Sequence, residues 1–257
     1  SCRKQVDKGF EMTVDLSISN PYLPMSVLVD TIESVRLQLP SPYFWGVVDN
    51  VISKDSCYYI SDRKQEMAFR FSKNGTFLNA IGQRGEGPGE YREMDSFFVG
   101  KDCVYVCDMG KRTIYSYSFD GKFLHSLSFP YSLVFNDVVE LPDGRFLCHR
   151  PSQSENCKGL WILDQKGRRV KNLLEYEKGT PCKNSYWNTL CAQEDGTIKI
   201  YNPVDGSYYQ YDAVNDTVVR TMRQKSNLPM LADLHCSDRE LYETKEECTY
   251  SLFTVDG

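Results

Sequence analysis

The feature that most constrains the fold of this 257-residue chain is an internal repeat with a period of 46 residues. Two stretches align without a gap: YYISDRKQEMAFRFSKNGTFLNAI, which begins at Tyr58, and VYVCDMGKRTIYSYSFDGKFLHSL, which begins at Val104. Identical residues recur at this offset, among them Asp62 with Asp108, Gly75 with Gly121 and Phe77 with Phe123. Self-similarity at such a period is typical of propellers and solenoids.

Two further units continue the repeat. Gly167 lies 46 residues beyond Gly121, and the pairs Asp143-Gly144 and Asp195-Gly196 have the form of tight hairpin turns. Apolar residues alternate within each unit, and turn signals recur about every eight to twelve residues, which excludes a solenoid of helices. We therefore predict an all-β protein, a β-propeller of four-stranded antiparallel blades with at least four blades between about residues 46 and 225.

Composition agrees with a sheet protein and excludes two classes of partner. The chain has only five alanines against 30 tyrosines and phenylalanines, a balance that disfavours long helices. A net charge of −5 gives no basic field for nucleic acid. No apolar stretch reaches the roughly 18 residues that a membrane-spanning helix needs, so we expect membrane contact only through a lipid anchor.

A glycine-rich stretch, IGQRGEGPGEYREM at residues 81–94, raises the question of a phosphate-binding loop. Such loops need Lys-Ser or Lys-Thr after the glycines and a helix behind them, whereas here Glu90 and Tyr91 lead into another predicted strand. We therefore expect this segment to cross from one blade to the next, with glycines where backbones approach closely.

The segments IGQRGEGPGEY, VYVCD and IYSYSFDGKFLHSL resemble the NHL-type blades of bacterial six-bladed β-propeller lipoproteins. The resemblance covers roughly residues 10–220 and implies six blades, binding or scaffolding as the function, and secretion to the cell envelope. It also implies lipid modification of Cys2, since these proteins are tethered through a leading cysteine. Six blades of 46 residues would exceed 257 residues, and residues 231–257 contain only two plausible strands.

The N-terminal segment is expected to be a tether. Residues 1–9 are mostly polar without apolar periodicity, so we predict a flexible tether there and a propeller domain over residues 10–257. With Cys2 as the lipidation site, the protein is expected to be a monomer anchored in the cell envelope, either periplasmic or exposed at the surface.

Candidate ligand-binding residues follow from the alternating strand directions. Loops after the second strand of each blade emerge on the same face as the crossing loops, at one mouth of the central channel expected of a propeller. Eight residues are predicted to line that face as a binding site for a protein or a carbohydrate-like ligand: Asp62, Arg84, Glu90, Tyr91, Asp108, His149, Arg150 and Asn202. The competing interpretation, which we favour for Asp62 and Asp108, is that these carboxylates cap their own turns.

No catalytic motif stands out, so a non-enzymatic binding protein is the first hypothesis. The alternatives are a metal-dependent hydrolase or lyase acting in the channel, and a structural scaffold in an envelope complex. No cofactor is predicted, although carboxylates with Asn202 could bind calcium. The ten cysteines form no CxxC pair, and most are expected to be small core residues.

Overall fold

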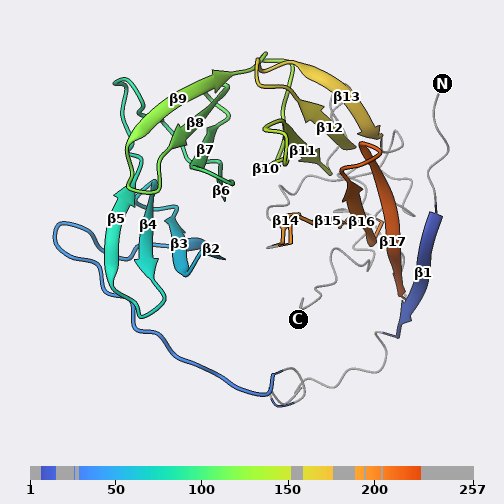
Figure 1. The fold of residues 1–257 in the computed structure, drawn as a ribbon, viewed down its shortest axis with the longest axis horizontal. Helices are drawn as coiled ribbons and strands as arrows, with labels where there is room; N and C mark the ends of the chain where they lie inside the picture. The colour runs from blue at the N-terminus through green and yellow to red at the C-terminus, as the bar shows by residue number, and fades with distance from the viewer. Residues whose placement is uncertain are drawn as a thin grey trace, which may run out of the picture. The chain divides into compact units, whose positions relative to one another are not determined.

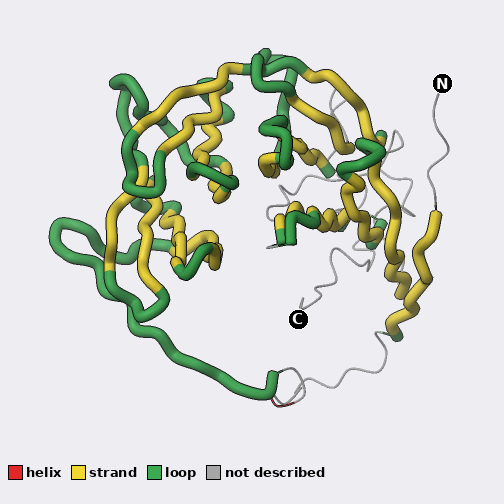
Figure 2. Tube along the Cα trace, viewed as in Figure 1, coloured by secondary structure: helices red, strands yellow, loops and turns green. Residues whose placement is uncertain are grey.

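The computed structural model describes residues 7–15, 26, 29–151, 159–175, 189–193, 195–203 and 205–226. The chain divides into two compact units, unit 1 (Ser1–Ser19 and Tyr131–Gly257) and unit 2 (Asn20–Pro130). Strands joined by turns and loops make up nearly all of the described residues (Figure 2). In these ranges no helix is long and apolar enough to cross a membrane.

Unit 2 contains two four-stranded antiparallel blades, with the strands in chain order within each sheet (Figure 1). The first blade consists of β2 (Val48–Lys54), β3 (Cys57–Asp62), β4 (Met67–Ser72) and β5 (Phe77–Ile81). The second consists of β6 (Ser96–Val99), β7 (Val104–Asp108), β8 (Thr113–Tyr117) and β9 (Phe123–Ser128).

Unit 1 contains the third and fourth blades, built in the same way. The third consists of β10 (Asp137–Glu140), β11 (Phe146–Arg150), β12 (Gly159–Leu163) and β13 (Arg169–Leu174). The fourth consists of β14 (Leu190–Ala192), β15 (Ile198–Asn202), β16 (Ser207–Asp212) and β17 (Thr217–Ser226). The predicted all-β propeller of four-stranded antiparallel blades is confirmed, with four blades in the described part of the chain; the count of six stays a prediction.

One strand departs from the antiparallel pattern. β1 (Asp7–Val14) adds a fifth strand to the fourth blade by pairing in parallel with β17, from Asp7 opposite Arg220 to Val14 opposite Ser226 (Figure 1). The strand begins inside the segment expected to be a tether, of which residues 1–6 lie outside the described residues. The two strands suggested for residues 231–257 also lie outside them.

The turns repeat with the sequence. Gly75, Gly121 and Gly167 close the last hairpin of three successive blades, with φ of 87°, 85° and 75°. L-residues rarely adopt this left-handed backbone, so glycine is the residue that the turn requires. Asp143-Gly144 and Asp195-Gly196 turn the first hairpins of the third and fourth blades, as predicted.

Each unit has its own apolar core between its two blades. In unit 2 the core between the first two blades includes Tyr59, Ile81, Tyr91, Val106 and Tyr117. In unit 1 the core joins Leu147, Leu160 and Ile162 of the third blade to Ile200, Tyr209 and Tyr211 of the fourth. Cys57, Cys103, Cys107 and Cys148 are buried free thiols, as expected for core cysteines, whereas Cys191 is exposed.

Candidate functional site

The four positions predicted to follow the second strand of each blade are structurally equivalent. Asp62, Asp108, Arg150 and Asn202 are the last residues of β3, β7, β11 and β15. In unit 2, the loops that follow β3 and β7 are both hydrogen-bonded to the crossing loop between Gly82 and Asp95, so they share one end of the blades as expected. We call the surface formed by residues 62–67, 82–95 and 108–113 the loop face of unit 2.

Asp62 and Asp108 make the same hydrogen bonds one repeat apart. Asp62 accepts the backbone N–H of Gly46 at 2.6 Å, and Asp108 accepts that of Arg92, 46 residues later, at 2.7 Å. The other carboxylate oxygen accepts Gln65 N–H in the first blade and Lys111 N–H, again 46 residues on, in the second.

Each aspartate therefore links the segment that precedes the first strand of its blade to the turn that follows the second strand. Both side chains are fully buried. Burial raises the pKa of Asp62, but four backbone N–H donors outweigh this effect and leave the pKa below its usual value. The turn-capping interpretation accounts for the carboxylate oxygens without a ligand.

Tyr91 is a core residue and does not line the surface. Its side chain is fully buried, its ring packs against Tyr115 and Tyr117, and its hydroxyl donates to the carbonyl oxygen of Glu66 at 2.7 Å. One repeat earlier, Trp45 makes the corresponding ring contacts with Phe69 and Phe71. The tyrosine of the GPGEY segment thus fills a position that each blade of unit 2 reserves for an aromatic ring.

The glycine-rich loop holds a carboxylate of its own. Glu90 Oε2 accepts the N–H of Gly87 at 2.8 Å, and Oε1 accepts a hydrogen bond from Gln83 Nε2 at 2.6 Å. A Cβ atom on Gly85 would collide with the Glu90 carboxylate, which explains the glycine there. The loop therefore binds a carboxylate with its backbone, but this carboxylate belongs to its own residue Glu90.

Lys111 fixes the crossing loop from the second blade. Its ammonium group donates to the carbonyl oxygens of Gly85 and Glu90, both at 3.1 Å, and lies 3.3 Å from Glu86 Oε2. The Lys111 side chain is only 19% exposed, so this ammonium belongs to the frame of the loop. The sequence contained no signal for this role beyond the position of a lysine in the turn.

Two further acidic groups of the loop face, Glu66 and Asp95, also bind backbone N–H groups. Glu66 Oε2 accepts the N–H of Met94 at 2.5 Å, and Asp95 Oδ2 accepts that of Met109 at 2.7 Å. Burial raises the pKa of both carboxyl groups above their usual values. These contacts tie the crossing loop to the turns on either side of it.

The side chains left at the surface of the loop face carry both signs of charge. Arg84, Glu86, Arg92 and Glu93 are exposed, and Arg92 Nε pairs with Glu86 Oε1 at 2.7 Å. Arg84 is thus the one member of the predicted ligand set in unit 2 that lies at the surface, while Glu90 is partly exposed. Backbone and buried carboxylates hold the loop, and its charged side chains project outward.

In unit 1, the predicted residue His149 belongs to a buried polar cluster. His149 Nδ1 lies 2.6 Å from Thr189 Oγ1, and Asp137 Oδ2 accepts the N–H of Leu190 at 2.9 Å and lies 3.5 Å from Thr189 Oγ1. Burial lowers the pKa of His149 to about 3 and raises that of Asp137 to about 6. Asp137 and His149 are direct cross-strand partners on β10 and β11.

This cluster joins the inner strands of the third and fourth blades, and its side chains are at most 7% exposed. The sequence did not indicate Asp137 and Thr189 as members of this cluster, because 52 residues separate them and neither occupies a repeated position. Asn202 is 2% exposed, and its backbone carbonyl oxygen accepts Gly206 N–H at 3.0 Å. Arg150, at the end of β11, is partly exposed.

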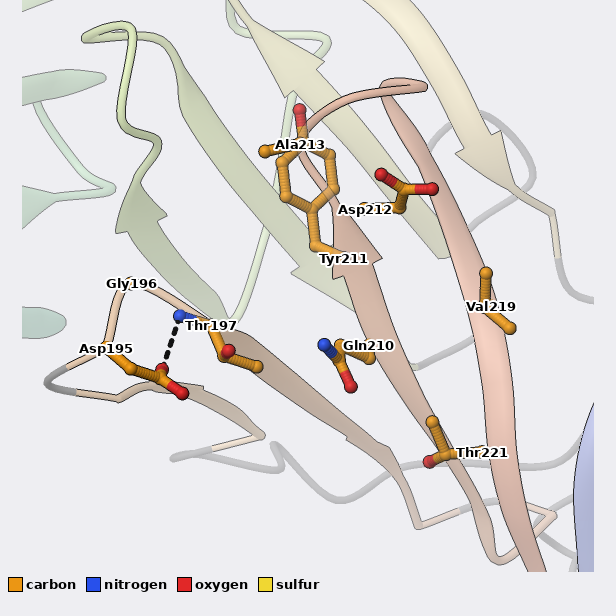
Figure 3. Close-up of a pocket in the computed structure, with 9 residues that line it drawn as sticks. All are labelled: Asp195, Gly196, Thr197, Gln210, Tyr211, Asp212, Ala213, Val219 and Thr221. Carbon is orange, nitrogen blue, oxygen red and sulfur yellow. Dashed lines mark hydrogen bonds between the residues drawn. The ribbon is translucent and has the colours of Figure 1, made fainter.

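An open hollow of about 430 Å³ lies on the fourth blade (Figure 3). Polar side chains of Asp195, Thr197, Gln210, Asp212 and Thr221 line it, and Asp195 accepts the N–H of Thr197 at 2.8 Å. None of the eight predicted ligand residues lies in it. Across the described ranges, no three His, Cys, Asp or Glu side chains gather as a metal-ion site, and calcium binding stays a prediction.

The sequence matches the family described as "Domain of unknown function (DUF4934)" over residues 11–247. The chain belongs to this family. No curated protein matches the chain.

Three solved structures are similar to this DUF4934 protein. A Bacteroides fragilis protein provisionally described as exported is 22% identical, with a TM-score of 0.63 over 75% of this chain and 55% of that one. A Bacteroides caccae protein of unknown function is 14% identical, with a TM-score of 0.45 over 71% and 61% of the two chains. Virginiamycin B lyase from Staphylococcus aureus is 10% identical, with a TM-score of 0.44 over 68% and 55%.

The DUF4934 chain therefore spans between half and two thirds of the length of these structures. At this level of identity, the Bacteroides fragilis structure supports the fold and carries no activity over to the chain.

Proposed function

We propose that this DUF4934 protein is a non-enzymatic, NHL-type propeller of six blades that is anchored in the cell envelope at Cys2. It is a monomer that binds a protein or carbohydrate-like partner with the loop face of unit 2. The observation that carries the proposal is that one set of side chains in that face binds the backbone of the loops, whereas a second, charged set is exposed at the surface.

The rigid support favours binding. Asp108, Glu66 and Lys111 bond to backbone groups of the crossing loop, so this loop is fixed before any partner arrives. A preorganised loop loses less conformational entropy on binding, which raises affinity for a given set of contacts. Loops held by a rigid scaffold are also where binding residues concentrate.

The contact surface is a revised version of the predicted ligand set. Arg84 and the neighbouring exposed side chains Glu86, Arg92 and Glu93 are proposed to touch the partner. Asp62 and Asp108 act through the loops that they hold, and Tyr91 acts by filling the blade beneath the crossing loop. The mixture of two positive and two negative groups suits a partner with both donors and acceptors.

The envelope location rests on Cys2 and on the relative from Bacteroides fragilis that is provisionally described as exported. A lipidated cysteine would hold the protein at a membrane without a membrane-spanning helix. Cys2→Ala is expected to release a folded protein from the membrane fraction. Retention of that variant in the membrane would contradict the anchor.

The binding test compares two charge reversals in unit 2. Arg84→Glu changes the loop face, while Asp102→Arg changes the exposed turn between β6 and β7 at the other end of the same blade. We expect purified Arg84→Glu protein to lose most of the wild-type binding to solubilised envelope components. Asp102→Arg protein should bind as wild type does. Equal binding by all three proteins would place the contact surface elsewhere.

A further inference from the structure

The parallel pairing of β1 with β17 fixes where the N-terminus enters unit 1. Asp7 lies opposite Arg220, near the start of β17, and Val14 lies opposite Ser226 at its end. The start of β17 follows the turn after Asp212, so the N-terminal end of β1 lies toward that turn. We call the end of unit 1 formed by the turns 141–145, 164–168 and 212–217, together with residues 193 and 195–197, the turn end.

Hydrogen bonds between the two blades show that these turns belong to one end of the unit. Arg145, in the first turn of the third blade, donates to both carboxylate oxygens of Asp216, in the last turn of the fourth, at 3.2 Å each. Lys171 Nζ, on β13 three residues after the turn 164–168, donates to Asp216 Oδ2 at 2.9 Å. The turns of the two blades therefore form a continuous surface.

The chain between Cys2 and Asp7 is too short to reach the other end. Five residues span at most about 17 Å when fully extended. Along β1, the seven steps from Asp7 to Val14 already cover about 23 Å. A lipid on Cys2 can therefore lie beside the turn end, but it cannot lie beside the loops at the far end of β17.

We infer that unit 1 faces the lipid bilayer with its turn end, and that its opposite end, where β15 ends and β16 begins, points away from the membrane. This inference rests on the proposed lipidation of Cys2 and deepens it by assigning an orientation. Val214, at the tip of the turn between β16 and β17, is 93% exposed and is the apolar side chain placed to touch the membrane surface. The turns carry acidic as well as basic side chains, so the lipid rather than a basic patch provides the attachment.

The orientation depends on β1 staying on the edge of the blade. Gly9 lies against the backbone of β17, where an added Cβ atom would come within 2.7 Å of the Thr221 carbonyl carbon and 2.9 Å of Met222 N. Gly9→Val is therefore expected to displace β1 and leave the lipid in place. The tether would then extend well beyond residue 7, and the molecule would no longer have a preferred end toward the membrane.

Energy transfer to the membrane tests the inference. A fluorophore is attached through a non-natural amino acid at position 214 or, as the matched control, at position 225 on the far end of β17, where the Lys225 side chain is 46% exposed. The acceptor is a headgroup-labelled lipid in phosphatidylcholine and phosphatidylglycerol vesicles carrying the full-length lipoprotein. Ten strand residues separate the two ends of β17 by about 30 Å.

We expect a clearly larger loss of donor emission at position 214 than at position 225, and loss of this contrast in Gly9→Val. Should Gly9→Val not fold, a flexible insertion of about 20 residues between Cys2 and Asp7 adds about 25 Å of reach and should remove the contrast as well. Equal or reversed transfer in the unaltered protein would overturn the orientation.

Vesicle flotation separates this outcome from a failure of the anchor. If the native protein does not float with vesicles, lipidation at Cys2 is wrong. The same chain joined enzymatically to a lipopeptide ahead of Asp7 then tests the orientation alone, because the geometry of β1 and the short tether are unchanged.

Discussion

Asp216 joins the third and fourth blades, and its neutralisation should destabilise unit 1. Arg145 donates to it through Nη1 and Nη2, Lys171 Nζ lies 2.9 Å from Oδ2, and the Tyr211 hydroxyl donates to Oδ1 at 2.5 Å. The perturbation is Asp216→Asn, which preserves size and tolerates the left-handed backbone at this position, φ 53°. The change therefore removes charge with little added strain.

The expected loss of stability follows from the pKa of Asp216. Burial raises the Asp216 pKa, but the hydrogen bonds from Tyr211, Arg145 and Lys171 outweigh it and lower the pKa from 3.8 to about 2. At 1.36 kcal/mol per pKa unit, this drop corresponds to about 2 kcal/mol. The side chain is 26% exposed, so solvent screening reduces the expected loss to about 1 to 2 kcal/mol.

The pH dependence has a definite sign. The folded pKa is depressed, so the stabilisation is complete above the unfolded pKa of about 3.9 and is lost as the pH falls through about 2. The difference between wild type and Asp216→Asn should therefore be full at pH 7 and shrink steadily between about pH 4 and pH 2.

Urea unfolding at several pH values provides the assay. With a slope of about 2 kcal/mol per molar urea, the midpoint for unit 1 should fall by about 0.5 to 1 M at pH 7. Asp120→Asn is the control, because the Asp120–Lys122 pair is largely exposed and should contribute little. An unchanged midpoint at pH 7, or a difference that persists undiminished near pH 2, would refute the reasoning.

Three further predictions test the account of the site. Tyr91→Phe should cost about 1 kcal/mol through loss of the bond to Glu66, while Tyr91→Ala should cost about 3 to 5 kcal/mol by opening a cavity, both measured by chemical denaturation. Gly121→Ala should be more destabilising than Gly196→Ala, although both glycines have positive φ. The new methyl group at position 121 meets the Ala80 carbonyl oxygen, whereas the one at position 196 meets no atom within 4 Å. Equal losses of stability would show that backbone strain alone determines the cost. Elemental analysis of protein purified without chelator should find no stoichiometric divalent ion, whereas a bound ion would favour the metal-dependent hydrolase or lyase.

The repeat made the fold predictable from the sequence. Residues such as Asp62 and Gly75 recur at Asp108 and Gly121 because each blade needs the same carboxylate at its second turn and the same left-handed residue at its last hairpin. A requirement that is local and repeated leaves a visible pattern. The parallel strand β1 left none, because its partner β17 lies more than 200 residues away and backbone pairing, to which the Lys225–Glu11 ion pair is added, requires no repeated residue.

The candidate site was predicted less well than the fold. The loop face and the equivalence of Arg150 and Asn202 with the two aspartates followed from strand alternation. Whether a side chain points outward did not follow, because Tyr91 has both an apolar ring and a polar hydroxyl and suits a core or a surface equally well. The His149 cluster depends on a contact with Thr189 across 40 residues, which no pattern in the sequence marks.

The proposed binding function is tested most directly by photo-crosslinking in living cells. A photoreactive amino acid replaces the exposed Glu93 on the loop face, so that Arg84 stays in place, or, in the control, the exposed Asp102 on the turn between β6 and β7. We predict a discrete crosslinked adduct from position 93 and none from position 102. Absence of an adduct at position 93, or equal crosslinking at both positions, would contradict binding through the loop face of unit 2.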